Sequence, residues 1–338
     1  MNKQLVPVID IGPFLDGDQG AGSTIARQLD EALQTIGFFT VVGHGVEEIL
    51  IQQARDLAFG FFNQSGSEKM KVANSLEHMS RGYNWMGNRS LAYTLGDETP
   101  PDLQEGFAFG PFKFEDDAYH QTLTAQNFFA PNIWPQWPHD FRSTFENYYN
   151  SMVSLAEKIM ELFALGLGIP ENYFADKIDK HTSVIRAIHY PTQSETPSLG
   201  QLRAGEHTDY GTLTILYGDD LPGGLQIKTR NGDWVDIHPT HGALVCNVGD
   251  LMSRWTNDRW VSNLHRVVNP PADYSGPGRI SIPFFHNTNY DALIQCVPSC
   301  VDDLAGPKYP PVLFSDHYLE KQTRAERKEN LFDRKPSQ

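Results

Sequence analysis

Two histidines and one aspartate in the second half of the chain have the spacing of a metal site. His207 and Asp209 stand two positions apart, directly before the β-rich run 212–217. Residues two apart on an extended strand share a face, whereas on a helix they would diverge by about 200°. This imidazole and this carboxylate can therefore point to one spot. A further imidazole, His265, lies in the strand-like run 264–268 and could complete the site.

The ligand types indicate which metal such a site would hold. Two histidines and one carboxylate form a facial triad, which suits Fe(II) because it leaves positions open for a chelating cosubstrate and O₂. The three cysteines, Cys246, Cys296 and Cys300, support neither a disulfide framework nor a cysteine-rich zinc site. On spacing alone, the alternative that the two histidines and the aspartate are ordinary polar residues stays open.

A second pair of residues could bind a carboxylate. Arg279 and Ser281 are again two apart in a strand-like run, and Ile280 and Ile282 occupy the other face. A guanidinium can hold a carboxylate by two parallel hydrogen bonds, and a hydroxyl can add a third. A surface arginine beside an unrelated serine is the alternative explanation. The position of the pair, after the third candidate ligand, favours a clamp for a dicarboxylate that also reaches the metal.

The elements that would carry these residues are short strands. Turn signals such as Asn231-Gly232-Asp233 separate them, and no helices alternate with them as a parallel sheet would require. The second half of the chain therefore predicts a double sheet or barrel. The expected strands are 184–190, 212–217, 224–227, 234–237, 243–247, 264–268 and 279–285.

The first half of the chain predicts helices around a few strands. Apolar residues recur at helical spacing from Ser23 to Ile36, between expected strands at 6–11 and 38–42, and a longer apolar stripe over 140–167 predicts one long helix. We also expect a helix over about 46–63, loops over 81–110 and a charged helix over 315–335.

The charge of the chain restricts its partners. It has 27 Lys and Arg against 42 Asp and Glu, a formal net charge of −15, which should repel phosphate backbones and anionic membranes. The N-terminal residues lack the apolar core of a signal peptide, and no later run has the ~18 apolar residues of a membrane helix. We expect a soluble cytoplasmic protein without nucleic-acid or membrane partners.

Several sequence motifs resemble a known family. In chain order, HTDYGTLTIL, PGGLQI, NVGD, HRVV and RISIPFF resemble the isopenicillin-N-synthase-like group of Fe(II)- and 2-oxoglutarate-dependent oxygenases. The earlier strings VPVID, GFFTVVGHGV, RGY and DLQEGF look like the N-terminal region of the same group. The resemblance therefore covers most of the chain.

The resemblance implies a fold and a division of the chain. The fold is mainly β with flanking α: a distorted double-stranded β-helix, or jelly roll, braced by N-terminal helices. We expect one domain over 1–338. Its parts are an N-terminal oxygenase region over 1–120, a spine helix with its connections over 121–180, a jelly-roll core over 181–300 and a C-terminal helical lid over 301–338.

The resemblance also implies roles for single residues. His207, Asp209 and His265 match the iron ligands, while Arg279 and Ser281 match the pair that binds the distal carboxylate of 2-oxoglutarate. Tyr190 looks like a tyrosine that supports the same carboxylate, and Phe285 matches an aromatic residue of the substrate pocket. We expect Phe109 and the rest of the 81–110 segment to line that pocket as well.

The implied activity is oxidation of a C–H bond of a small metabolite, by hydroxylation, desaturation or ring closure, with conversion of 2-oxoglutarate and O₂ to succinate and CO₂. Two alternatives remain at this point. One is an iron oxidase of the same fold that does not use 2-oxoglutarate, and the other is a non-catalytic sensor that binds a metabolite. Neither the primary substrate nor any protein partner can be identified from the sequence.

Overall fold

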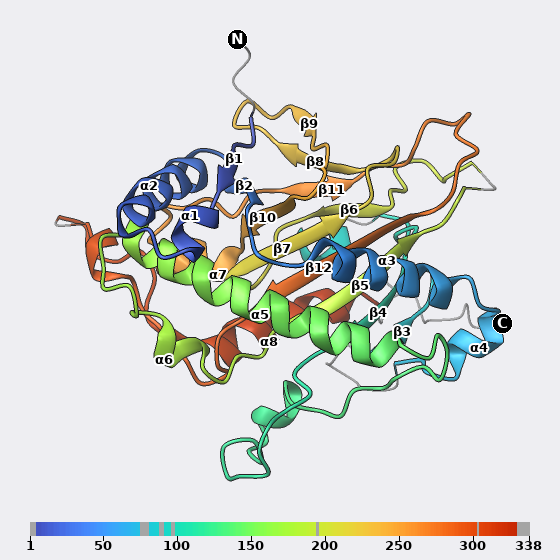
Figure 1. Ribbon diagram of the computed structural model, residues 1–338, viewed down its shortest axis with the longest axis horizontal. Helices are drawn as coiled ribbons and strands as arrows, with labels where there is room; N and C mark the ends of the chain where they lie inside the picture. The colour runs from blue at the N-terminus through green and yellow to red at the C-terminus, as the bar shows by residue number, and fades with distance from the viewer. Residues whose placement is uncertain are drawn as a thin grey trace.

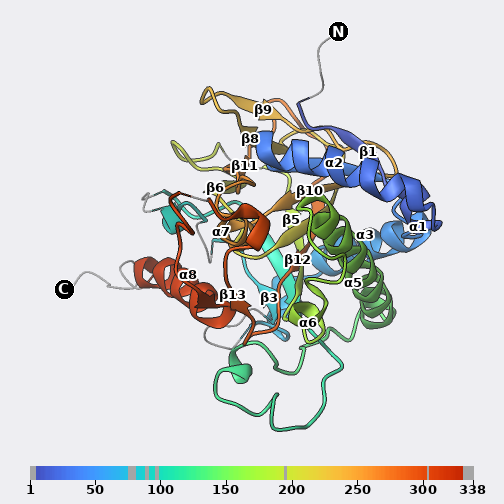
Figure 2. The same cartoon turned by 90° about the vertical axis from the view of Figure 1, so that its left-hand side faces the viewer.

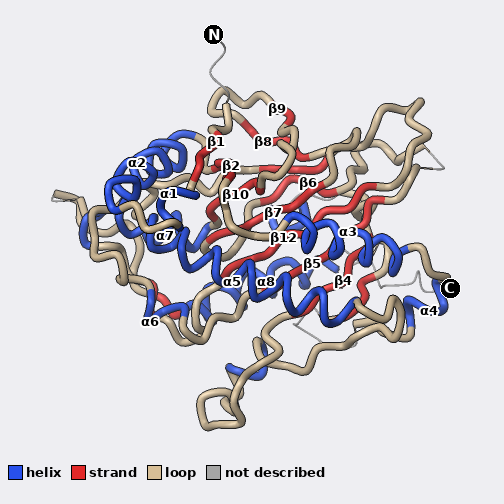
Figure 3. Tube along the Cα trace, viewed as in Figure 1, coloured by secondary structure: helices blue, strands red, loops and turns tan. Residues whose placement is uncertain are grey.

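Two β-sheets face each other at the centre of the molecule (Figures 1 and 3). The computed structural model describes residues 5–74, 81–87, 91–95, 99–193, 196–302 and 304–329. The larger sheet has eight strands in the order β1 (Val8–Asp10), β2 (Phe38–Val42), β10 (Leu244–Val248), β7 (Leu213–Gly218), β12 (Arg279–His286), β5 (Val184–Tyr190), β4 (Glu105–Phe109) and β3 (Gly82–Asn84). The smaller has four, in the order β6 (Ala204–His207), β11 (His265–Val267), β8 (Leu225–Lys228) and β9 (Trp234–Asp236). This arrangement confirms the predicted jelly-roll class.

The N-terminal segment completes the larger sheet at both edges. β1 pairs in parallel with β2, which is antiparallel to β10, while β3 and β4 extend the sheet beyond β5. The N-terminal part and the second half of the chain thus share one sheet. The division of the chain into four regions stays a prediction.

Helices cover the outer face of the larger sheet. The long helix α5 (Phe141–Gly166) packs against α2 (Gln19–Thr35), α3 (Glu48–Phe62) and β12, and Figure 2 shows these helices on the side of the sheet away from α8 (Phe314–Glu329). The remaining helical elements are α1 (Gly12–Leu15), α4 (Gly66–Met70), α6 (Ala175–Ile178), α7 (Asp250–Trp255), η1 (Leu91–Leu95), η2 (Ala125–Asn127) and η3 (Pro298–Cys300), and a separate pair of strands is β13 (Leu293–Ile294) and β14 (Val312–Leu313).

The alternation of β12 divides its residues between two environments. Ile280, Ile282 and Phe284 are fully buried in the main apolar core, which also contains the buried side chains of α5. Arg279 and Ser281 face the other way, towards the smaller sheet, and line a pocket. One strand therefore supplies both the core and the wall of a cavity, as its period of two requires.

Two sequence predictions about secondary structure are wrong. The 81–110 segment is not all loop, because it contains β3, η1 and β4, and β6 has no counterpart among the expected strands. Every residue of β4 is buried, so the strand lacks the alternation of polar and apolar residues that marks a half-exposed strand. Residues 88–90 and 96–98 of the segment, and 330–335 of the predicted C-terminal helix, lie outside the described residues.

Among the described helices, none combines the length and the apolar character needed to cross a membrane.

Asp30 on α2 ties the helical layer to the loop after α7. Its carboxylate accepts hydrogen bonds from Arg259 Nε (3.1 Å) and Nη2 (2.7 Å) and from Trp260 Nε1 (2.8 Å). The indole of Trp260 is fully buried, so loss of this acceptor leaves its N–H without that partner in the interior, which is costly.

We expect Asp30→Asn to lower the free energy of unfolding by about 1–3 kcal/mol, because the hydrogen bonds to Arg259 lose their charge and one of the two acceptor oxygens is replaced by an NH₂ group. Chemical denaturation monitored by tryptophan fluorescence measures the change. Glu31→Gln removes the same charge from an exposed neighbouring position and should stay within about 0.5 kcal/mol of the wild type. Equal effects of the two substitutions would contradict the role given to Asp30.

Candidate active site

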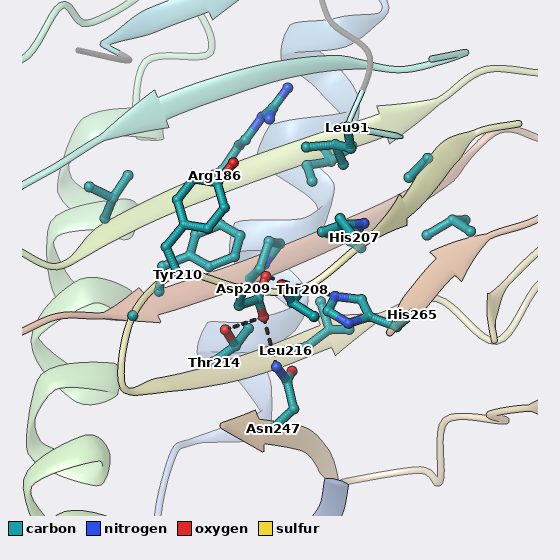
Figure 4. A pocket seen from close by; sticks show the side chains of 18 of the residues that line it. Leu91, Arg186, His207, Thr208, Asp209, Tyr210, Thr214, Leu216, Asn247 and His265 are labelled. Carbon is teal, nitrogen blue, oxygen red and sulfur yellow. Dashed lines mark hydrogen bonds and ion pairs between the residues drawn. The ribbon is translucent and has the colours of Figure 1, made fainter. Parts of the chain in front are cut away.

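The structure brings His207, Asp209 and His265 together between the two sheets. His207 is the last residue of β6 and His265 the first of β11, and these residues are paired in the smaller sheet. β6 ends before Asp209, which lies in the connection to β7, so the two residues do not share one strand as predicted. One ligand atom from each of the three residues nevertheless lies within 4.8 Å of the other two (Figure 4).

Hydrogen bonds orient both imidazoles. His207 Nδ1 lies 2.8 Å from the carbonyl oxygen of Gly205, and His265 Nδ1 lies 3.0 Å from that of Asn263. A carbonyl oxygen can only accept, so Nδ1 donates in each ring and the lone pair is left on Nε2. His265 Nε2 lies 3.7 Å from Asp209 Oδ1. Both rings therefore offer Nε2 to a metal.

The carboxylate of Asp209 is held by its second oxygen. Oδ2 accepts hydrogen bonds from Thr214 Oγ1 (2.6 Å) and from Asn247 Nδ2 (2.7 Å). Figure 4 shows both bonds as dashed lines on the side of Asp209 away from His207. This arrangement leaves Oδ1 to face the imidazoles, which suits a monodentate metal ligand.

The electrostatics of the three residues favour the protonation states that bind a metal. Burial lowers the pKa of His207 to about 4, and the neighbouring His265 and Arg186 act in the same direction. Burial would raise the pKa of Asp209, but the two imidazoles and two hydrogen bonds outweigh it and hold that pKa below its ordinary value. At neutral pH His207 is neutral and Asp209 is a carboxylate, the forms required of metal ligands.

The predicted carboxylate clamp lies in the same pocket. Arg279, Ser281 and Tyr190 are buried and line the pocket with the three candidate ligands. Arg279 pairs with Tyr190 across β12 and β5, and its guanidinium carbon lies 5.7 Å from the centre of the tyrosine ring. The structure thus groups all six of these sequence-predicted residues around one cavity.

The position of Arg279 depends on Asp219, a residue that was not identified from the sequence. Its Nε donates to the backbone carbonyl of Asp219 (3.0 Å), and the Asp219 carboxylate accepts from the Ile280 N–H (2.9 Å). Arg55 on α3 donates to the same carboxylate from Nε (3.1 Å) and Nη2 (3.2 Å). The helical layer thereby anchors the segment from which the Arg279 guanidinium reaches the pocket.

The two predicted pocket phenylalanines have different fates. Phe285 lines the pocket, on the same face of β12 as Ser281. The prediction for Phe109 is wrong, because its fully buried side chain packs against Trp134 and Phe145 (ring centres at 5.0 and 5.3 Å). On β4 it is Ala108 that faces the pocket, and its neighbour Phe109 points to the opposite face because strand residues alternate.

Other pocket residues were also not identified from the sequence. Thr214, Asn247 and Arg186 line the pocket without having been singled out, whereas Leu91 and Ala108 lie in the 81–110 segment that was expected to contribute to it. Tyr318 of the C-terminal helix α8 lines it as well. The motif NVGD, which contains Asn247, was the signal that could have found one of them. Thr214 lies in the motif HTDYGTLTIL, which could have indicated it in the same way, whereas Arg186 lies in a strand-like run without a recognised motif.

Comparison with known proteins agrees with this geometry. Residues 6–137 match the family model described as non-haem dioxygenase in morphine synthesis N-terminal, and residues 181–288 match that of the 2OG-Fe(II) oxygenase superfamily. Over 92% of its length the chain is 35% identical to the 2-oxoglutarate-Fe(II) type oxidoreductase hxnY of Emericella nidulans, covering 87% of that protein. It is 32% identical to the homoarginine-6-hydroxylase 2-ODD-233 of Oryza sativa subsp. japonica, covering 94% of this chain and 96% of the relative.

Solved structures show the same similarity. The crystal structure of a full-length Neurospora crassa protein in complex with alpha-KG superposes with a TM-score of 0.82 at 30% identity, covering 94% of this chain and 96% of that one. A 2OG-Fe(II) oxygenase family protein from Caulobacter crescentus gives a TM-score of 0.81 at 27% identity, covering 95% and 99%. Family models, relatives and fold agree with the His-Asp-His site, and the chain therefore belongs to the 2OG-Fe(II) oxygenase superfamily.

Proposed function

We propose that this oxygenase hydroxylates a C–H bond of a small molecule, with His207, Asp209 and His265 as the iron ligands. The observation that carries the proposal is the convergence of the three ligand atoms within 4.8 Å in a pocket that Arg279 and Ser281 also line. When bound, Fe(II) and 2-oxoglutarate supply the chemistry: O₂ and 2-oxoglutarate give succinate and CO₂, one oxygen atom enters the succinate, and the other enters the substrate. The residues of the chain bind and orient the reactants.

Arg279, Ser281 and Tyr190 would hold the distal carboxylate of 2-oxoglutarate. The buried guanidinium is a permanent cation, and its anchoring to the Asp219 carbonyl orients it before the cosubstrate arrives. A hydroxyl two residues along the same strand face can add one hydrogen bond. A carboxylate held at this wall leaves the other end of 2-oxoglutarate to reach the triad.

The names of relatives support a small-molecule substrate and hydroxylation. Several plant relatives are named homoarginine-6-hydroxylase, and the similar N. crassa protein has been crystallised with alpha-KG and thymine. Hydroxylation, desaturation and ring closure all begin with removal of a hydrogen atom from a C–H bond of the substrate. The position of the substrate in the pocket therefore decides which of the three reactions follows.

An iron oxidase that works without 2-oxoglutarate is the second candidate. A relative 26% identical over 332 residues is named 1-aminocyclopropane-1-carboxylate oxidase, from Dictyostelium mucoroides. Oxygen uptake with and without 2-oxoglutarate distinguishes the candidates. We expect 2-oxoglutarate to be required and succinate formation to rise when the primary substrate is added. Substrate-dependent oxygen uptake in the absence of 2-oxoglutarate would reverse the proposal.

We expect His207→Ala and Asp209→Ala each to lose stoichiometric Fe(II), because one of three protein ligands is missing. Asn247→Ala, which removes only a hydrogen bond to Asp209 Oδ2, should weaken Fe(II) binding about 10–100-fold. Anaerobic competition with a coloured chelator measures these affinities. The control is His241→Ala, which removes an imidazole that is 87% exposed and should bind iron normally. One full equivalent of iron in His207→Ala or Asp209→Ala would refute the ligand assignment.

Arg279→Ala should raise the dissociation constant of 2-oxoglutarate by about ten- to a hundredfold, since a charge-assisted hydrogen-bonded contact contributes roughly 1.5–3 kcal/mol. Calorimetric titration of the anaerobic Fe(II) protein gives this constant. Arg266→Ala is the control, because Arg266 stacks on Trp234 (4.0 Å to the ring centre) and does not line the pocket. Unchanged 2-oxoglutarate binding with weakened primary-substrate binding would assign Arg279 to the substrate instead.

Phe285→Leu and Phe109→Leu make the same change on opposite sides of the larger sheet. In Phe285→Leu we expect a higher ratio of succinate to oxidised product, because the pocket wall holds the substrate less closely. Phe109→Leu should leave that ratio unchanged and lower the free energy of unfolding by about 1 kcal/mol. Product analysis by mass spectrometry together with denaturation measures both, and a normal ratio in Phe285→Leu would exclude Phe285 from the substrate wall.

A further inference from the structure

Arg186 is a cation of the pocket that the roles above do not use. It lies on β5 and shares the pocket-lining face with Val184, Ile188 and Tyr190. These four residues are two apart in sequence, so the alternation of the strand directs them all to the same side. Arg186 therefore faces the cavity as part of the regular geometry of the strand.

The neighbouring strand makes room for the Arg186 guanidinium. Gly106 on β4 has no side chain, and a Cβ atom built there would lie 2.8 Å from Arg186 Nε. Arg279 is accommodated in the same way, since a Cβ at Gly218 on β7 would lie 2.6 Å from its Nη2. Both distances are shorter than real Cβ contacts, so a glycine on the adjacent strand permits the position of each arginine.

Arg186 and the metal ligands lie in one pocket but apart. Figure 4 shows Arg186 above Asp209 and His265, with its guanidinium directed away from them. A molecule of modest size could contact the guanidinium with one group and present another part to the metal.

The charges around the pocket indicate what Arg186 would bind. Among the described residues that line it, Asp209 is the only acid, and its carboxylate belongs to the metal site. The permanent cations among these same residues are two arginines, and Arg279 is assigned to the cosubstrate. Much of the remaining wall is apolar or aromatic, including Leu91, Phe285 and Tyr318.

We propose that Arg186 is a specificity-determining residue that binds a carboxylate of the primary substrate, so that the enzyme acts on small carboxylic acids with an apolar body. The proposal rests on the proposed function, because it needs iron and 2-oxoglutarate at the triad and at Arg279. It rests on the place of the guanidinium and its permanent charge. A planar carboxylate matches the parallel N–H groups of a guanidinium.

This role parallels that of Arg279. One arginine would hold the cosubstrate by a carboxylate, and the other would hold the substrate by a carboxylate at the far end of the pocket. Fixing one end of the substrate limits which of its C–H bonds can approach the metal. Arg186 would then influence both the choice of substrate and the position of oxidation.

The experiment compares acids with their neutral amides. The anaerobic Fe(II)–2-oxoglutarate protein is titrated in a calorimeter with benzoate and benzamide, phenylacetate and phenylacetamide, and hexanoate and hexanamide. Each pair keeps the apolar body and removes the charge. We expect the wild type to bind at least one acid about tenfold or more tightly than its amide, as a charge-assisted contact implies. Equal binding within every pair, including no binding of either member, would overturn the proposal.

Two variants test whether Arg186 causes the preference. Arg186→Gln removes the charge, and Gly106→Ala displaces the guanidinium while retaining it. Both should reduce the preference for the acid about tenfold or more, while Arg266→Ala keeps it. If both variants still prefer the acid over its amide, the proposal is overturned. It is also overturned if the preference is lost only together with 2-oxoglutarate binding, because Arg186 would then bind the cosubstrate.

Separate measurements distinguish this proposal from the proposed function. Binding of Fe(II) and of 2-oxoglutarate is first measured in the wild type and in each variant. If the wild type binds neither, the proposed function fails. If both bind normally and the acid preference does not depend on Arg186, only the assignment of Arg186 fails.

Discussion

The period of two along the strands of the larger sheet is the constraint on which the rest of the structure depends. On β12 it sends Ile280, Ile282 and Phe284 into the core under the helices, and Arg279, Ser281 and Phe285 into the pocket. A shift of register by one residue would exchange these sets, burying a guanidinium in the apolar core and emptying the pocket wall. The stability of the core thereby holds the site residues on their side of the sheet.

The polar groups of the site are oriented by partners on other elements. The Asp209 carboxylate is held by hydrogen bonds from Thr214 of β7 and Asn247 of β10. Arg279 donates to the backbone carbonyl of Asp219, and Arg55 of α3 binds the side-chain carboxylate of the same aspartate. These partners occupy Oδ2 of Asp209 and Nε of Arg279, so that the other polar atoms of each group remain for a metal or a carboxylate. A metal or a carboxylate that enters the pocket meets groups that are already aligned, so little ordering is required on binding.

The accuracy of the sequence predictions follows from the kind of signal that each used. The long helix and strands such as β5 and β2 have strong periodicity and were located within a few residues of their observed bounds. β4 has no alternation of polar and apolar residues because both of its faces are buried, so its sequence predicts a loop. The wrong prediction for Phe109 has the same origin. Unless β4 is recognised as a strand, its alternation cannot be used to decide that Ala108 faces the pocket and Phe109 the core.

By itself the sequence determined the chemical identity of the site. The spacing of His207 and Asp209 leaves ordinary polar residues as an alternative, but together with His265, the Arg279–Ser281 pair and the motifs that contain them it indicates an iron site with a carboxylate clamp. Only the tertiary structure decided which neighbours orient these groups and which further residues join them. Asn247, Arg186 and Asp219 reach the site through strand pairing between segments distant in sequence, and that pairing depends on burial over the whole sheet rather than on any local pattern.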